Sequence, residues 1–260
     1  DEHLYNELGR FTPREAMLSD GAYSDGALVD FLVKRLDCRC ENGGEARFRL
    51  DAARTAAEKQ FSAGLDALPA GDDAALQAVG GLLSYLYETQ KTDLSHLSTL
   101  TYFTTGQFME LDLTARRNLE LTETLRGREK RGTLLWVLDK TSTSMGKRML
   151  RSWIEQPLIS SALINHRLNA VESLVKQTMT RGDLTEELGY IADMERLMTR
   201  TVYGSATPKE IYTLAQTCDR LPGLRRLAEA CGCPELAELA VQIDPLEDIK
   251  ARIYAAVDPE

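Results

Sequence analysis

The sequence has 260 residues, enough for one large or two modest domains with ordinary hydrophobic cores. Hydrophobic residues make up 43% and charged residues 27%, which excludes a disordered chain, and no apolar run is long enough to cross a membrane. The net charge of −9 excludes a nucleic-acid-binding surface over the whole molecule, so any contact with phosphate must be local.

The first 40 residues predict the last part of an α/β unit. Residues 4–11 are typical of the end of a helix, and the apolar run 16–18 predicts a buried strand. Asp25 is suited to cap a helix over residues 25–36. These elements are too few to form a domain alone, and the chain starts without Met within a helical pattern. We therefore expect the chain to be a piece of a longer protein.

The polar segment 38–44 contains Asn-Gly-Gly and is the best candidate for a domain boundary. After it, the pattern predicts helices over 51–62 and 72–90. Gly80 and Gly81 lie inside the second helix, where each glycine costs up to about 1 kcal/mol relative to alanine. We therefore expect another backbone to pack closely against this helix.

Residues 92–107 are rich in Thr, Ser and Gly and predict an extended connection. The alternation of Met109, Leu111 and Leu113 with acidic residues predicts a short strand after it. Beyond Leu158 the pattern is helical without a fixed repeat, which favours a bundle or lever-like array over a solenoid. These helices are expected near 160–178, 182–201, 207–220, 222–231 and 234–257. The predicted fold class is therefore mainly α, a helical lever or bundle preceded by a partial α/β segment.

The central stretch, residues 111–158, carries the clearest helix signals. Either Asp112 or Thr114 can cap the helix that begins at Ala115, and Thr133 can cap a short apolar helix over 134–138. Both caps would satisfy amide groups that have no partner inside their helix.

The next helix begins at Thr143 or Ser144, and Pro157 stops it. Gly146, near its start, would let another element approach without a Cβ in the way. Helical spacing predicts one buried apolar stripe on this helix, with charged residues beside it. The stripe consists of Met145, Met149, Leu150, Trp153 and Ile154, and the charged residues are Lys147, Arg148, Arg151 and Glu155.

Three segments, 111–121, 132–158 and 164–174, resemble the core domain of the MutS family of bacterial DNA mismatch-repair ATPases. The match departs from the family pattern where Ala115 follows Thr114, and where Thr143-Ser144 replaces the more usual Thr-Pro. The residues that carry the motif are Asp112, Thr114, Arg116, Arg117, Asn118, Leu119, Asp139, Thr141, Met145, Gly146, Arg148, Arg151, Trp153 and Pro157.

The resemblance implies three regions. Residues 1–40 resemble the last part of a connector domain with an RNase H-like fold, and residues 41–107 resemble a helical link. Residues 108–260 resemble the first part of the core or lever domain, before the clamp is inserted. Such a segment would link the DNA clamp, the mismatch-reading domain and the ATPase, and would perform no catalysis itself.

The cofactors and partners implied by the resemblance belong to the full-length protein. The Gly-x-x-x-x-Gly-Lys-[Ser/Thr] phosphate loop does not occur in this sequence, so ATP and Mg²⁺ are expected elsewhere in that protein. Its partners would be mismatched double-stranded DNA, MutL and a second copy of itself, in the bacterial cytoplasm and at the nucleoid when acting. The chain alone is expected to self-associate through exposed helical faces.

A basic run from Arg126 to Arg151 has eight Lys or Arg residues against two acids. These side chains could contact DNA phosphates, or they could form a solvated face with salt bridges to acidic helices and other domains. We favour the second interpretation, because side chains suited to reading bases are scarce there. The candidates for weak contacts with the DNA backbone or with other domains are Arg126, Arg128, Lys130, Arg131 and Lys147.

Cysteine, histidine and acidic residues give no clear signal of an enzyme. Five cysteines argue against a disulfide framework, and the pairs Cys38/Cys40 and Cys231/Cys233 lack common zinc spacing, so we expect reduced thiols and no metal. The three histidines are scattered, and the acids at 186–187, 193 and 195 are expected to face solvent. The alternative function, motivated by the acidic flanks, is a free-standing helical protein-interaction module.

Overall fold

The computed structural model describes residues 2–61, 71–89, 94, 97–100, 102 and 105–257. Its contacts divide the chain into unit 1 (Asp1–Thr105) and unit 2 (Gly106–Glu260), joined where the 3₁₀ turn η4 (Thr105–Gln107) lies. The connection predicted over 92–107 falls partly outside the described residues. No helix in the described ranges is both long and apolar enough to span a bilayer.

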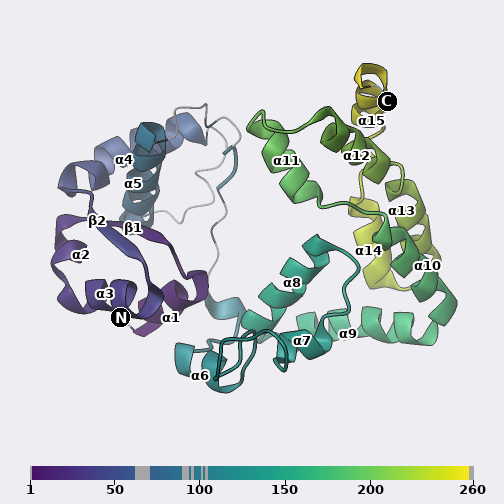
Figure 1. The fold of residues 1–260 in the computed structure, drawn as a ribbon, viewed down its shortest axis with the longest axis horizontal. Helices are drawn as coiled ribbons and strands as arrows, with labels where there is room; N and C mark the ends of the chain where they lie inside the picture. The colour runs from purple at the N-terminus through teal and green to yellow at the C-terminus, as the bar shows by residue number, and fades with distance from the viewer. Residues whose placement is uncertain are drawn as a thin grey trace. The chain divides into compact units, whose positions relative to one another are not determined.

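Unit 1 is built around two short parallel strands with helices on both faces (Figure 1). The strands pair in register, Glu15 opposite Arg39 and Leu18 opposite Asn42. Its elements in chain order are α1 (Glu2–Phe11), β1 (Glu15–Leu18), α2 (Asp20–Ser24), α3 (Gly26–Asp30), the π-helix η1 (Phe31–Arg35), β2 (Arg39–Asn42), the 3₁₀-helix η2 (Glu45–Phe48), α4 (Leu50–Gln60) and α5 (Asp73–Thr89).

The helix predicted over 25–36 is present as α3 and η1. The Asp25 side chain caps it as predicted, because its carboxylate accepts hydrogen bonds from the amides of Ala27 and Leu28. Leu32 is almost completely buried in a core that includes Leu28 and the side chains from one face of the sheet. The last five residues widen into a π turn, a detail that apolar spacing does not reveal.

The second core of unit 1 lies between α4 and α5. Its buried side chains include Ala53, Ala57 and Leu83. The close approach predicted at Gly80 is confirmed, because a Cβ at this position would lie 2.4 Å from the Cα of Ala53. Gly81 instead makes room for the Phe48 ring. Small residues on both helices therefore let the two backbones meet.

Unit 2 is helical throughout its described length, apart from turns and one isolated bridge between Phe108 and Leu158. Its helices are α6 (Leu113–Asn118), α7 (Leu134–Leu138), α8 (Ser144–Glu155), α9 (Ser161–Lys176), α10 (Thr178–Gly189), α11 (Met194–Val202), α12 (Pro208–Cys218), α13 (Leu221–Ala230), α14 (Pro234–Gln242) and α15 (Glu247–Ala256). The mainly α fold class is thus confirmed.

The strand predicted from Met109 to Leu113 is wrong. Only Phe108 forms a bridge, and the Met109 amide donates to the carbonyl of Pro157 at 2.8 Å. The Asp112 side chain caps the next helix, so Leu113 is already helical. A capping side chain here overrides the two-residue alternation.

Two helices predicted as continuous are each divided. The helix over 182–201 breaks between α10 and α11, where Asp193 caps a new helix. The helix over 234–257 breaks between α14 and α15, where Pro245 precedes Leu246 in a left-handed conformation. Local caps end these helices although the apolar pattern continues through them.

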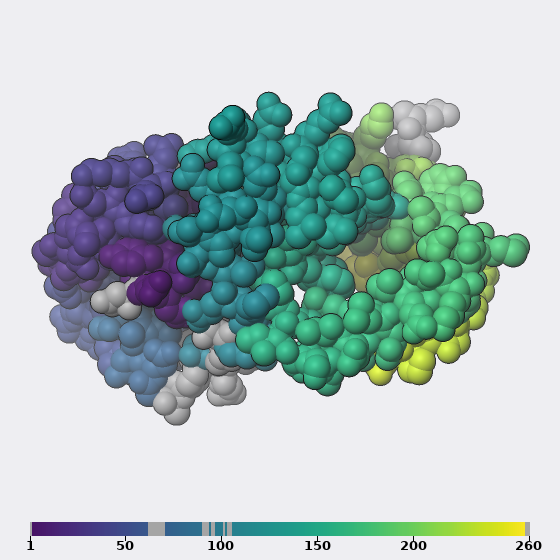
Figure 2. Space-filling view, turned by 90° about the horizontal axis from the view of Figure 1, so that it is seen from below, coloured from purple at the N-terminus to yellow at the C-terminus, as the bar shows by residue number. Residues whose placement is uncertain are grey.

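The buried side chains of unit 2 gather in α12, α13 and α14, with Ala215, Cys218 and Ala240 among the most enclosed. By contrast, α8, α9, α10 and α11 contain no buried residue. Teal-to-green residues of this unit lie on the face turned to the viewer in Figure 2.

Candidate functional sites

The family-like motif begins at α6 with contacts to its own backbone. The Asp112 carboxylate accepts a hydrogen bond from the Ala115 amide at 2.5 Å, so Asp112 rather than Thr114 is the cap. The Arg116 Nε donates to the carbonyl oxygen of Leu111 at 2.9 Å. Thr114, Arg117, Asn118 and Leu119 are exposed.

The start of α7 is hydrogen-bonded to the segment that follows α6. The amides of Leu134 and Leu135 donate to the carbonyls of Glu120 and Leu121 at 3.1 and 2.9 Å. The Thr133 hydroxyl caps α7 as predicted, because it accepts from the Trp136 amide at 3.1 Å and donates to the Lys130 carbonyl at 2.8 Å. Thr133 is almost fully buried, so this capping hydroxyl is shielded from water.

Asp139, Thr141 and Lys147 come together at the turn before α8. The Asp139 carboxylate accepts from the Thr141 hydroxyl at 2.7 Å and pairs with the Lys147 ammonium at 2.6 Å. These hydrogen bonds, the one from Lys147 first, lower the pKa of Asp139 to about 2. The carboxylate is therefore charged at neutral pH and fixes the turn.

Gly146 lies directly behind the cap of α8. The Thr143 hydroxyl accepts from the Gly146 amide at 2.9 Å, which confirms Thr143 as the helix start. A Cβ at Gly146 would lie 2.9 Å from that same hydroxyl oxygen. The glycine therefore makes room for the capping side chain of its own turn, whereas the sequence predicted the approach of another element.

Arg148 connects α8 to α11. Its guanidinium donates to both carboxylate oxygens of Asp193, at 2.8 and 2.7 Å, and also to Glu195. Asp193 in turn accepts from the Arg196 amide and caps α11. The Arg148 hydrogen bonds lower the pKa of Asp193 to about 2, and the two acids raise the pKa of Arg148.

The expectation that Asp193 faces solvent is wrong, because its side chain is only 17% exposed beneath Arg148. The two residues are 45 positions apart, and no local pattern in the sequence joins them. Glu195, which is 67% exposed at its side chain, faces solvent as predicted even while it binds Arg148.

The buried stripe predicted on α8 is also wrong. Met149 is 58% exposed and Trp153 is 42% exposed, while Met145, Leu150 and Ile154 are only half-buried. Trp153 is instead covered by the Arg167 guanidinium, 3.7 Å from the ring centroid. Helical spacing identified an apolar face correctly, but full burial depends on neighbouring elements, and in the described chain they cover this face only in part.

The basic loop, defined here as Arg126–Arg131 between α6 and α7, is fully exposed. Within the described part of the chain, none of its four cations has an ion-pair partner. Lys147, the fifth candidate, lies apart because Asp139 binds it. Arg151 pairs with Glu155 in its own helix at 2.9 Å.

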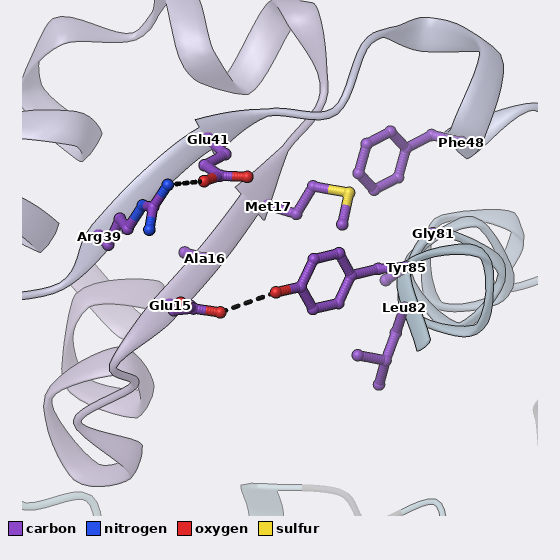
Figure 3. Close-up of a pocket in the computed structure, with 10 residues that line it drawn as sticks. Glu15, Ala16, Met17, Arg39, Glu41, Phe48, Gly81, Leu82 and Tyr85 are labelled. Carbon is purple, nitrogen blue, oxygen red and sulfur yellow. Dashed lines mark hydrogen bonds and ion pairs between the residues drawn. The ribbon is translucent and has the colours of Figure 1, made fainter. Parts of the chain in front are cut away.

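Unit 1 contains a cavity of about 200 Å³ that the sequence does not indicate. It lies between the sheet and α5, where the Tyr85 hydroxyl donates to the Glu15 carboxylate at 2.8 Å (Figure 3). Figure 3 also shows the Met17 side chain between the sheet and the Phe48 ring. The bond to Glu15 raises the pKa of Tyr85, because the carboxylate accepts from the protonated phenol.

The cysteine residues do not assemble a metal centre in the described ranges, where no group of three or more potential ligands occurs. All five thiols are free, and burial raises the pKa of Cys38, Cys218 and Cys231. Buried thiols of this kind are protonated and unreactive at neutral pH. His166 lies 3.1 Å from a Glu238 oxygen, and His96 is outside the described residues.

These features define a helical packing segment with a small α/β unit before it. Comparison with known proteins agrees: residues 1–98 match the family model of MutS domain II, and residues 114–260 match that of MutS domain III. The chain belongs to the MutS family and consists of connector and core parts of a DNA mismatch repair protein.

Similar proteins include the DNA mismatch repair protein MutS of Lachnoclostridium phytofermentans, which is 37% identical over 259 residues. That match covers 99% of this chain and 28% of the relative. MutS of Alkaliphilus oremlandii is 46% identical over 182 residues, covering 70% of this chain and 21% of the relative. The chain thus spans less than a third of such relatives, and the boundaries predicted at residues 40 and 107 stay a prediction.

Proposed function

We propose that this chain is the structural and allosteric link of a mismatch-recognition ATPase, located between a DNA clamp, a mismatch-reading domain and a nucleotide site in the full-length protein. The observation that carries the proposal is the Arg148 bridge. One guanidinium in the family-like motif binds the carboxylate that caps α11, so a shift of α8 acts directly on α11.

In this function the segment transmits changes and catalyses nothing itself. ATP and Mg²⁺ bind elsewhere in the full-length protein, which acts on mismatched double-stranded DNA as a homodimer. The connector part, predicted at residues 1–40, offers MutL a docking surface. The protein works in the bacterial cytoplasm, at the nucleoid when engaged on DNA. The family models and the names of the relatives support the place of this chain in a DNA mismatch repair protein.

The Arg148 bridge is tested in a full-length protein that carries this segment. Arg148→Met is expected to reduce the stimulation of ATP hydrolysis by mismatched DNA at least about fivefold, because coupling energies are typically 1–3 kcal/mol. ATP binding is expected to be unchanged. Arg151→Met, which removes a pair inside α8 only, is the matched control and should retain the stimulation.

Two outcomes would contradict the proposal. One is full stimulation of the ATPase in the Arg148→Met protein, which would show that the bridge transmits nothing. The other is ATP hydrolysis by the 260-residue chain alone, which would place a catalytic site inside it.

A further inference from the structure

The basic loop is a group of exposed positive charge in unit 2. Arg126, Arg128, Lys130 and Arg131 are all exposed, and Glu129 is the single acid among them. Three other cations of the basic run are neutralised nearby, Lys147 by Asp139, Arg148 by Asp193 and Arg151 by Glu155. Lys140, outside the loop, is exposed and has no ion-pair partner in the described chain. Four adjacent charges without partners in the described chain form a positive surface on an otherwise acidic protein.

The loop holds a defined shape through its own hydrogen bonds. The amide of Thr124 donates to the Glu129 carbonyl at 2.9 Å, and the Thr124 hydroxyl accepts from the Glu129 amide at 3.0 Å. The same hydroxyl donates to the Arg126 carbonyl at 2.8 Å. Gly127 and Gly132 have positive φ angles of 85° and 94°, which close the turn. A preformed loop loses less conformational entropy when it binds a ligand.

An aromatic ring borders the loop. Trp136 is 50% exposed, and the Arg131 guanidinium lies 5.9 Å from its ring centroid. Exposed arginine and lysine residues supply many of the contacts that proteins make to the phosphates of duplex DNA. Few amide side chains suited to base edges occur here, so such binding would not depend on base sequence.

We propose that the basic loop, with Trp136 at its border, binds the phosphate backbone of duplex DNA. The positive charge and the loop shape are independent of the function proposed above, but the choice of DNA over another polyanion rests on that function. The interpretation favoured from the sequence is a solvated face with salt bridges to acidic helices and other domains. The four residues are exposed, as that interpretation predicts, and no salt bridge to them occurs in the described chain.

The test measures binding of the whole chain to a fluorescein-labelled 20-base-pair duplex by anisotropy, over a range of NaCl concentrations. Four phosphate contacts predict a Kd of about 10⁻⁴–10⁻⁶ M at moderate salt and a log–log salt slope of about −3.6. The variant with Arg126, Arg128, Lys130 and Arg131 all changed to Gln should bind at least about tenfold more weakly and lose most of the slope.

A matched control separates the loop from net charge. It changes four other exposed cations without ion-pair partners in the described chain to Gln, and so removes the same total charge. These residues are Arg35, Arg54, Lys209 and Arg226. The control is expected to bind within about threefold of the unchanged chain, since screened charges outside the proposed contact contribute little. Thermal unfolding of both variants verifies that each is folded.

Trp136 provides a second readout. Trp153→Phe leaves Trp136 as the single tryptophan, and duplex DNA should then change its fluorescence only when the loop cations are present.

The proposal fails if the two quadruple variants lose affinity equally, or if the unchanged chain shows no binding in 50 mM NaCl. It also fails if polyglutamate at equal charge displaces the duplex as well as unlabelled DNA does, because the loop would then be a site for an acidic protein segment. None of these results touches the Arg148 bridge, so the proposed function stands or falls separately.

Discussion

The α4–α5 pair in unit 1 and the α8–α9 region in unit 2 are both amphipathic by sequence, yet they differ in what covers them. Ala53 and Gly80 let α4 and α5 approach so closely that a Cβ at position 80 would not fit, and Leu83 is 2% exposed. In α8 and α9 no residue is buried, and side chains such as Met149 and Val175 are about 60% exposed. Apolar spacing predicts a face that prefers burial, whereas burial itself requires small residues or a neighbouring element opposite that face.

The largest expected effect is a difference in the free energy of unfolding between a buried leucine variant and an exposed methionine variant. Leu83→Ala should lower the free energy of unfolding by about 2–5 kcal/mol, because it leaves a cavity in the α4–α5 core. Met149→Ala should change it by less than about 0.5 kcal/mol, since most of that side chain is already in water. Urea unfolding followed by far-UV circular dichroism compares them. Equal losses would mean that the α8 face is covered in solution.

A pair of glycines sharpens the same contrast. Gly80→Ala should destabilise by about 1–3 kcal/mol, because the new Cβ meets the backbone of Ala53. Gly182→Ala, in α10, has open space around it and should stabilise by about 0.4–1 kcal/mol through lower entropy of the unfolded chain. Thermal unfolding should move in opposite directions for the two variants. A stabilised Gly80→Ala protein would show that the helices lie further apart.

The caps give a smaller difference within unit 2. Thr133→Ala should cost about 1–2 kcal/mol, because it removes a buried cap that also bonds the Lys130 carbonyl. Ser160→Ala should cost only a few tenths of a kcal/mol, since this exposed cap reaches the Leu163 amide at 3.5 Å. Trp136 lies in the helix that Thr133 caps, so tryptophan fluorescence during urea unfolding monitors the change. Identical costs would contradict the role of burial.

The smallest expected effect is a pH dependence of the stability that the Arg148–Asp193 ion pair contributes. Because Arg148 lowers the pKa of Asp193 from 3.8 to about 2, the stabilisation is complete above pH 4 and is lost as pH falls towards 2. Tm of the unchanged chain should exceed that of Arg148→Met at pH 7, and the difference should disappear near pH 2. Arg151→Met serves as the control, with a smaller difference. A gap in Tm that persists at pH 2 would rule out the ion pair as its source.

Features set by neighbouring residues could be predicted from the sequence. The caps Asp25, Thr133 and Thr143 were identifiable because a cap needs only the amides two or three positions ahead of it. Gly80 was also informative, since a glycine inside a helix needs a packing reason.

Features that join distant residues could not be predicted. Arg148 and Asp193 are 45 positions apart, and nothing near either residue indicates the other. The exposure of Trp153 likewise depends on which elements surround α8, and a single sequence does not record that. Charge composition located the basic loop, but only the structure separates its unpaired cations from Lys147, which Asp139 holds.

The break between α10 and α11 has a mechanical consequence. A single helix over residues 178–202 would be a rod of about 37 Å, stiff along its whole length. Instead, the chain bends at residues 190–193, where the buried Thr217 hydroxyl accepts from the Ala192 amide at 3.3 Å and Arg148 holds Asp193. Two polar side-chain contacts thus hold the angle between the two helices. Replacing either side chain should therefore change how easily the segment bends at residues 190–193.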